Sequence, residues 1–269
     1  MNNKTPHHQF ITHNGASIHF NVQGEGKNVI LLHGYLESMQ IFDDFALKMS
    51  QVARVVTIDL PGHGLSDLIK SSPSLDSMAE AIKNVADHLN MTQLYLMGHS
   101  MGGYVTLAFA EKYPQMLQGL ALLHSTPNPD TPEKQKNRQR EMDLIRKGKK
   151  EIICKSSIPN TFANTNRELF AQKIQQITNT ACKTPDEGII AALESMMNRP
   201  DQNEMLSKLE AKKISLIGKQ DNFIPWESAL ETCNKTNMHP ILLESSGHMG
   251  FIEEPNECLQ QIIAEMELG

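Results

Sequence analysis

The sequence predicts an α/β fold: a mostly parallel sheet of eight strands, flanked by helices and carrying a helical insertion. Short continuous apolar runs, which suit strands covered on both faces, alternate with segments whose apolar residues have helical spacing. Between residues 128 and 203 this alternation stops, and only helix-like segments follow one another. Alternation of strand and helix implies parallel strands with helices on both faces of the sheet.

The chain is predicted to open with a β-hairpin. Residues 10–12 and 17–23 alternate apolar and polar side chains around Asn14-Gly15, a dipeptide typical of tight turns. Strands and helices then alternate. The next predicted strands are 29–32 and 52–58, and the next predicted helices are 39–50 and 75–89, the second with Ser74 as its N-cap.

A short stretch further along the chain combines a strand, a turn and a helix. Residues 94–97 are apolar and end at the pentapeptide 98–102, Gly-His-Ser-Met-Gly, which leads into a helix-like run. Gly-x-Ser-x-Gly at such a junction is typical of a nucleophile elbow, in which a serine on a strained turn exposes its hydroxyl. Side chains at Gly98 and Gly102 would clash where helix and strand approach closely. The pentapeptide is common by chance, but this context makes Ser100 the candidate nucleophile.

The insertion interrupts the core of the predicted fold. One more buried strand is predicted at 117–123, and after the insertion the alternation resumes. The later predicted elements are strands 214–217 and 240–243 and helices 226–233 and 256–266. We therefore expect an α/β core made of residues 1–127 and 204–269, with residues 128–203 as a helical cap.

Composition excludes several classes of protein. The 269 residues include 39% hydrophobic residues, as in ordinary globular domains, and the formal net charge of −6 leaves no basic footprint for nucleic acid. No apolar run approaches the roughly 20 residues that cross a bilayer, and residues 1–9 lack the apolar core of a signal peptide. Four scattered cysteines without metal-type spacing favour reduced thiols. We expect a cytoplasmic protein without a metal site, a nucleic-acid partner or membrane insertion.

A serine hydroxyl is a weak nucleophile at neutral pH and needs a base. His248 lies in a loop after the last predicted strand and Asp221 follows the strand before it, so both reach the sheet edge where Ser100 lies. The carboxylate would fix the imidazole tautomer and stabilise its charged form. Taken singly, Asp221 also suits a helix cap and His248 an ordinary loop. Together, in the order Ser, Asp, His, they predict a catalytic triad.

Acyl transfer also requires N–H donors for the developing oxyanion. Two backbone amides are candidates: Met101, at a helix start where the helix dipole assists, and Tyr35, just after a strand that ends in His-Gly. Residues near these motifs are candidates for the wall of a substrate pocket. They are His33, His99, His124 and Met249. For the three histidines, hydrogen bonding or packing is the alternative that we favour.

Five motifs resemble the landmarks of the α/β-hydrolase superfamily, in the order of that family. They are Leu-His-Gly (32–34), Asp-Leu-Pro-Gly-His-Gly-Leu-Ser (59–66), Gly-His-Ser-Met-Gly-Gly (98–103), Gly-Lys-Gln-Asp (218–221) and Gly-His (247–248). The resemblance implies a triad of Ser100, His248 and Asp221, an oxyanion hole from Tyr35 and Met101, and a cap over the site. The sequence Met-Asn-Arg-Pro-Asp before the penultimate strand is similar to small esterases, enol-lactonases and cofactor-free peroxidase-like members. Tyr35 stands where the peroxidase-like members frequently have Phe or Trp, and this difference argues against a perhydrolase side activity.

These features predict a serine hydrolase that cleaves a small carboxylic ester, thioester or lactone through an acyl-enzyme, without a cofactor. Its partner would be a small-molecule ester or acyl substrate. Two alternatives stay open: a hydrolase or lyase that breaks a carbon–carbon bond with the same triad, and a small-ligand receptor with slow hydrolysis. The basic segment 134–150 either binds an anionic substrate or carrier or is a solvated helix face, and we favour the second.

Overall fold

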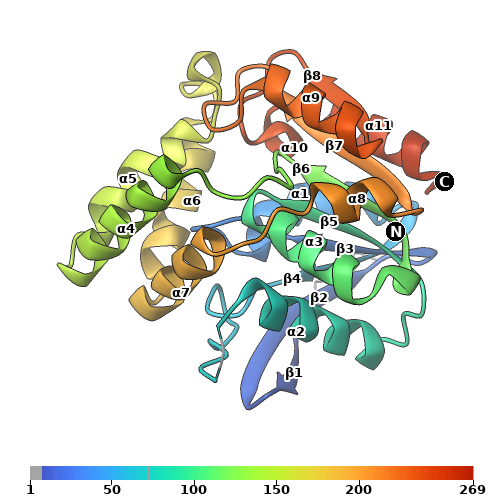
Figure 1. The fold of residues 1–269 in the computed structure, drawn as a ribbon, viewed down its shortest axis with the longest axis horizontal. Coiled ribbons are helices and arrows are strands. Elements are labelled where there is room, and N and C mark those ends of the chain that lie inside the picture. Colours follow the sequence, from blue (N-terminus) through green and yellow to red (C-terminus); the bar gives the residue numbers. More distant parts are fainter. Residues whose placement is uncertain (1–7, 72, 269) are drawn as a thin grey trace.

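The computed structural model describes residues 8–71 and 73–268, so most of the segment 1–9 lies outside the described residues. Within the described chain, eight strands form one sheet in the order β1-β2-β4-β3-β5-β6-β7-β8 (Figure 1). The strands are β1 (Gln9–His13), β2 (Ala16–Gln23), β3 (Lys27–Leu32), β4 (Ala53–Ile58), β5 (Leu94–His99), β6 (Leu117–Leu123), β7 (Lys212–Gly218) and β8 (His239–Leu243). Strand β2 pairs antiparallel with β1 and β4, and the other neighbours are parallel. The predicted mostly parallel, eight-stranded sheet is confirmed.

Helices flank this sheet and fill the connections between parallel strands. Those of the α/β alternation are α1 (Asp43–Met49), α2 (Leu75–His88), α3 (Met101–Lys112), α8 (Asn203–Lys208), α9 (Trp226–Thr236), α10 (Gly250–Glu253) and α11 (Pro255–Met266). Between β6 and β7 lie α4 (Pro132–Arg146), α5 (Lys150–Asn160), α6 (Ala171–Lys183) and α7 (Asp186–Met197). Short 3-10 turns are η1 (Met39–Phe42), η2 (Pro114–Met116) and η3 (Asn164–Asn166). Figure 1 shows α4–α7 gathered on one side of the molecule, beside the sheet. None of the described helices combines the length and apolar character needed to span a membrane.

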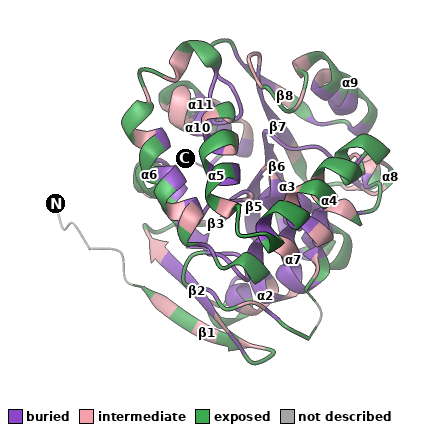
Figure 2. Ribbon diagram, turned by 90° about the vertical axis from the view of Figure 1, so that its left-hand side faces the viewer, coloured by how far each residue is buried: buried purple, intermediate pink, exposed green. Residues whose placement is uncertain are grey.

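The core lies along the central strands. Every residue of β5 is buried, whereas the edge strand β1 alternates between half-buried and exposed residues (Figure 2). The difference follows from position, because a central strand is covered by helices on both faces and an edge strand is not. Parallel strands that end together in this buried layer bring the residues after β3, β5, β7 and β8 to one edge of the sheet.

Local sequence signals account for most element boundaries. Ser74 caps α2 as predicted, and it exchanges side-chain and backbone hydrogen bonds with Ser77. Helix α3 begins at Met101, directly after Ser100, because tertiary packing overrides the low helix propensity of Gly102-Gly103. The short helix α10, which follows His248, was not predicted, since four residues carry no periodic pattern.

Two glycines allow β3, β5 and α3 to approach closely. A Cβ at Gly98 would overlap the carbonyl group of Gly102, and a Cβ at Gly102 would overlap the carbonyl oxygen of Leu32. Both collisions are with backbone, which side-chain movement cannot relieve. The steric reason predicted for these glycines is therefore present, and it sets the close approach of α3 to the ends of β3 and β5.

Candidate active site

Ser100 lies on a strained turn between β5 and α3. Its φ of 49° and ψ of −112° are unusual for a residue with a side chain. Neighbouring backbone holds this conformation: Ser100 N–H donates to Leu123 O at 3.0 Å, and Gly103 N–H donates to Ser100 O at 3.0 Å. The Ser125 hydroxyl also donates to Ser100 O, at 2.7 Å. These bonds over-determine the turn, as expected of a nucleophile elbow.

Asp221 and His248 meet at the same edge of the sheet. His248 Nδ1 lies 2.7 Å from Asp221 Oδ2, and Asp221 Oδ1 accepts the N–H groups of Phe223 at 2.8 Å and Ile224 at 3.1 Å. Burial alone would raise the pKa of the Asp221 carboxyl, but the neighbouring His248 and His124 rings outweigh burial and hold this pKa far below its usual range. An ionised carboxylate therefore fixes the proton of His248 on Nδ1 and leaves Nε2 free to accept one.

His124 lies on the other side of the Asp221 carboxylate. The ring is buried, and its Nε2 accepts the N–H of Gly250 at 3.0 Å, so its proton resides on Nδ1, 3.6 Å from Asp221 Oδ2. Side-chain atoms of His124, Asp221 and His248 lie within 4.8 Å of one another, close enough to be considered as metal ligands. However, a ring nitrogen that carries a proton cannot bind a metal, so the geometry favours an imidazole donor facing the carboxylate.

Ser100 and His248 face one cavity of about 520 Å³. Tyr35 also lines it, and Met101 begins α3, where the first N–H groups of a helix have no partner within the helix. None of the described hydrogen bonds involves the Ser100 hydroxyl. The hydrogen bond between a catalytic serine and its histidine is often long in the absence of substrate and shortens when substrate binds. The structure thus brings Ser100, His248 and Tyr35 together around one space, and the buried Asp221 carboxylate is hydrogen-bonded to His248.

The four residues predicted for the pocket wall do not line this cavity, and that prediction is corrected. They are His33 and His99 (both 0% exposed), His124 (2%) and Met249 (0%). Hydrogen bonds hold the rings in the layer beneath the site: His33 Nε2 accepts Leu60 N–H at 2.9 Å, and His99 Nε2 lies 2.9 Å from His248 O. For the histidines, the structural alternative is the one that the geometry supports.

Helix α4 supplies wall residues, of which the sequence analysis considered only those of the basic segment 134–150. The Tyr35 hydroxyl donates to Glu141 Oε1 at 2.8 Å, and burial raises the pKa of both groups. Lys134, Arg138 and Glu141 are spaced by four and three residues and so share one face of α4. That spacing was the available signal. Of the eight basic residues in 134–150, only Lys134 and Arg138 line the cavity, and Arg138 is ion-paired with Asp130.

Two buried histidines are expected to make stability depend on pH. Burial lowers the pKa of His63 to about 3 and that of His124 to about 4. The unfolded chain, in which both regain a pKa near 6.5, therefore binds more protons than the folded chain below that pH. The contribution of these two histidines to the free energy of unfolding should be fully present above about pH 6.5. It should decrease as the pH falls toward 4, by roughly 1–2 kcal/mol per histidine at about pH 5.

Urea denaturation at about pH 7.5 and about pH 5 would measure this effect in the wild type and in His63→Gln. The variant should lose less free energy of unfolding between the two pH values, because one acid-sensitive group is gone. The same loss in both proteins would contradict a neutral, buried His63.

With this geometry in view, comparisons with known proteins identify the class. The model of the alpha/beta hydrolase fold family matches residues 27–150. A 2-hydroxy-6-oxononadienedioate/2-hydroxy-6-oxononatrienedioate hydrolase from Escherichia coli is 27% identical over 228 residues, which cover 79% of this chain and 77% of that protein. The structure of a thermophilic esterase from Thermogutta terrifontis with malate bound is similar, with a TM-score of 0.91, 27% identity, and coverage of 97% of this chain and 98% of that one.

An enol-lactonase from Burkholderia xenovorans LB400 shares the fold at a TM-score of 0.88 and 18% identity, over 96% of this chain and 100% of that one. The sheet order, the elbow and these likenesses agree with each other. The chain has the α/β-hydrolase fold, and its similarity to hydrolases and esterases makes it an enzyme of the hydrolase class.

Proposed function

We propose that this protein is a serine hydrolase that cleaves a small carboxylic ester, thioester or lactone through an acyl-enzyme. One observation carries the proposal. Ser100, on its strained turn, opens onto the same cavity as His248, whose Nδ1 is hydrogen-bonded at 2.7 Å to a buried Asp221. A nucleophile, a base and a group that orients the base are the parts that acyl transfer requires.

The proposed reaction proceeds in two halves. Ser100 Oγ attacks the carbonyl carbon of the substrate while His248 Nε2 takes the hydroxyl proton, and Asp221 stabilises the imidazolium. The oxyanion accepts hydrogen bonds from Tyr35 N–H and Met101 N–H, the second at the positive end of the α3 dipole. His248 then gives its proton to the leaving oxygen of an ester or lactone, or to the leaving sulfur of a thioester, as the acyl bond breaks. In the second half, His248 takes a proton from a water molecule, which attacks the carbonyl carbon of the acyl-enzyme. Ser100 Oγ then leaves, regains its proton from His248, and the carboxylic acid is released.

The helical segment 128–203 is proposed as a cap that sets substrate choice. Helices α4, α5 and α7 contribute side chains to the cavity wall. Part of this wall is apolar, and part carries charged groups of α4. The apolar members are Leu36, Ile158, Met196, Phe223 and Ile224. A space of about 520 Å³ with such a wall suits a small or medium acyl chain.

A carbon–carbon bond hydrolase is the second candidate. The similar hydrolase from Escherichia coli is named for a substrate with two carboxylates. Lys134 and Arg138 on the cavity wall are cations of the kind that bind carboxylate groups. Against this candidate, Arg138 is already paired with Asp130, and Glu133 and Glu141 line the same cavity. We therefore rank ester hydrolysis first.

Three measurements separate these proposals. A fluorophosphonate probe should label Ser100, identified by peptide mass spectrometry, and p-nitrophenyl esters from acetate to octanoate should be hydrolysed with a preference that reports cavity depth. For a vinylogous 1,5-diketone dicarboxylate, kcat/KM should be at least about tenfold lower than for the best ester, which corresponds to an activation free energy about 1.4 kcal/mol higher. Cleavage of the diketone in preference to every ester would favour the second candidate. Labelling with tight ligand binding and almost no turnover would instead favour a receptor.

A further inference from the structure

Among the described residues, the ring of His99, the residue before the proposed nucleophile, contacts two hydrogen-bond acceptors and no donor. Its Nδ1 lies 2.9 Å from Glu37 Oε2, and its Nε2 lies 2.9 Å from the carbonyl oxygen of His248. A carbonyl oxygen only accepts, and so does an ionised carboxylate. When Glu37 is ionised, both contacts are hydrogen bonds at once only if both ring nitrogens carry protons, that is, if His99 is an imidazolium.

The electrostatics of the pair agree with this protonation state. Burial alone would lower the pKa of His99, but the charge of Glu37 and the bonds to Glu37 and His248 outweigh burial and raise it. Burial alone would raise the pKa of Glu37, but His99 and further donors lower it. The side chains are 0% and 2% exposed, so little water screens their attraction. A buried ion pair is favourable when its remaining polar atoms also find partners.

The same carboxylate oxygen reaches the loop that contains Tyr35. Gly34 N–H donates to Glu37 Oε2 at 2.5 Å. A Cβ on Gly34 would lie 2.8 Å from Glu37 Oε2 and 2.9 Å from His99 Nδ1, so only glycine leaves space for the three groups. Glu37 and His99 therefore connect three segments: the loop after β3, the elbow, and the backbone of the base.

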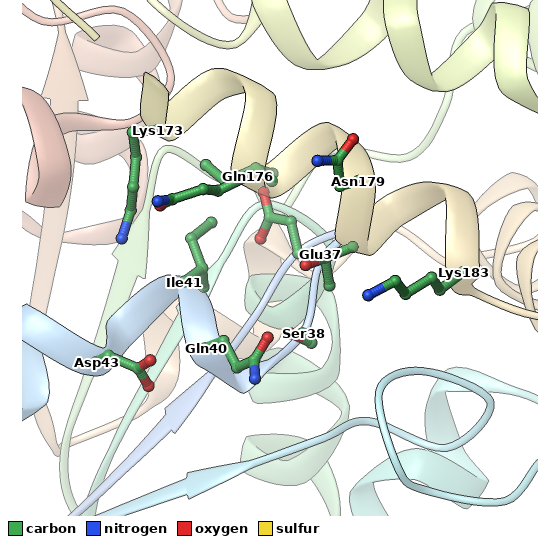
Figure 3. Close-up of a pocket in the computed structure, with 11 residues that line it drawn as sticks. Glu37, Ser38, Gln40, Ile41, Asp43, Lys173, Gln176, Asn179 and Lys183 are labelled. Carbon is green, nitrogen blue, oxygen red and sulfur yellow. The ribbon is translucent and has the colours of Figure 1, made fainter. Parts of the chain in front are cut away.

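Glu37 makes these contacts although other cations are near. A second cavity of about 380 Å³ lies between η1 and α6, and Glu37 lines it together with Lys173 and Lys183 (Figure 3). Within the described chain, however, the hydrogen bonds of the carboxylate go to Gly34 and His99, and Lys173 lies 3.7 Å from Asp44. The Glu37 side chain lies between the two cavities, and its hydrogen bonds go to groups next to the active site rather than to the lysines of the second cavity.

We propose that ionised Glu37 and protonated His99 are positioning residues, which together fix the Tyr35 amide and the His248 backbone relative to Ser100. This inference rests on the proposed serine mechanism. The imidazolium donates to the carbonyl oxygen of His248, and because that carbonyl group is bonded to the Cα of His248, the contact also fixes the position from which the His248 side chain extends. The carboxylate holds Gly34 N–H and so the orientation of the next peptide, which carries Tyr35 N–H. Small displacements of either group are costly in catalysis.

Glu37→Gln tests the pair with little change of shape. The neutral amide no longer stabilises the imidazolium, so His99 keeps one proton for two acceptors and one of its bonds is lost. We expect kcat/KM to fall about 10- to 100-fold, with the loss in kcat and with KM within about threefold. Labelling of Ser100 by the fluorophosphonate probe should slow by a similar factor. His99→Gln should behave alike, and the double variant should lose less than the product of the two single effects.

A second buried histidine–carboxylate pair provides the matched control. His19 Nδ1 lies 2.7 Å from Asp59 Oδ2, both side chains are buried, and neither residue lines the active-site cavity. His19→Gln should lower Tm as Glu37→Gln does, yet leave kcat and the labelling rate within about twofold of wild type. If a folded Glu37→Gln protein also stays within about twofold in kcat, the positioning role is wrong.

A measurement on the wild type keeps the inference testable even if the variants unfold. In ¹⁵N-labelled protein near neutral pH, both ring nitrogens of His99 should give the chemical shifts of protonated nitrogen. An unprotonated nitrogen would overturn the ion pair. The two proposals fail separately: absence of labelling at Ser100 removes the serine mechanism, whereas the protonation state of His99 is read without any turnover.

Discussion

Ser100→Ala is expected to abolish both turnover and covalent labelling. Alanine keeps the Cβ but removes the hydroxyl that attacks the substrate, so kcat/KM for the best p-nitrophenyl ester should fall by about four to six orders of magnitude. The residual rate would come from the oxyanion donors and from substrate binding. Initial-rate kinetics with fluorophosphonate labelling measure the effect.

The stability of this variant should be close to that of the wild type. The turn at Ser100 is strained at φ 49° for alanine as for serine, and its hydrogen bonds to Leu123 and Ser125 use backbone atoms of residue 100. Ser207→Ala, a serine-to-alanine change in α8 away from the cavity, serves as the control and should retain labelling. More than about one per cent of wild-type kcat/KM in purified Ser100→Ala would contradict the proposed nucleophile.

The fold was predictable because its signals are local. The apolar runs within β3 and β5 are continuous, β6 is interrupted near its start by Gln118, and buried parallel strands favour that pattern. The contact between Asp221 and His248 was predictable for a topological reason, since residues that follow neighbouring parallel strands converge at one edge of the sheet. Neither inference needs the path of any side chain.

The sequence favoured hydrogen bonding or packing for the buried histidines, but it did not identify their partners, which depend on such paths. His33, His99 and His124 each sit at a strand end, and a strand-end side chain points either into the cavity or into the layer below it. Glu37 pairs with a residue 62 positions away, and no periodicity links the two. The lining residues of α4 were not identified for another reason: those that face the cavity are polar or charged, so no apolar spacing marks them.

Asp221→Asn is expected to reduce kcat/KM by about 10³- to 10⁴-fold at neutral pH, although it changes only one atom of the side chain. The surroundings decide which way the new amide points. Oδ1 of Asp221 accepts two backbone N–H groups, from Phe223 and Ile224, and only the oxygen of an asparagine can replace it there. The NH₂ group must then occupy the position of Oδ2, facing His248 Nδ1.

A donor at that position reverses the tautomer of the base. His248 Nδ1 must accept from the amide, so the proton of the neutral ring moves to Nε2, which then cannot take the proton of Ser100. Because the bonds to Phe223 and Ile224 survive, the protein should fold, and Asp221→Asn should be no more active than Asp221→Ala, which imposes no tautomer. The comparison requires kcat/KM and labelling rates for both variants. An asparagine variant that keeps more than about a tenth of wild-type kcat/KM would show that Asp221 does not hold the base in its working tautomer.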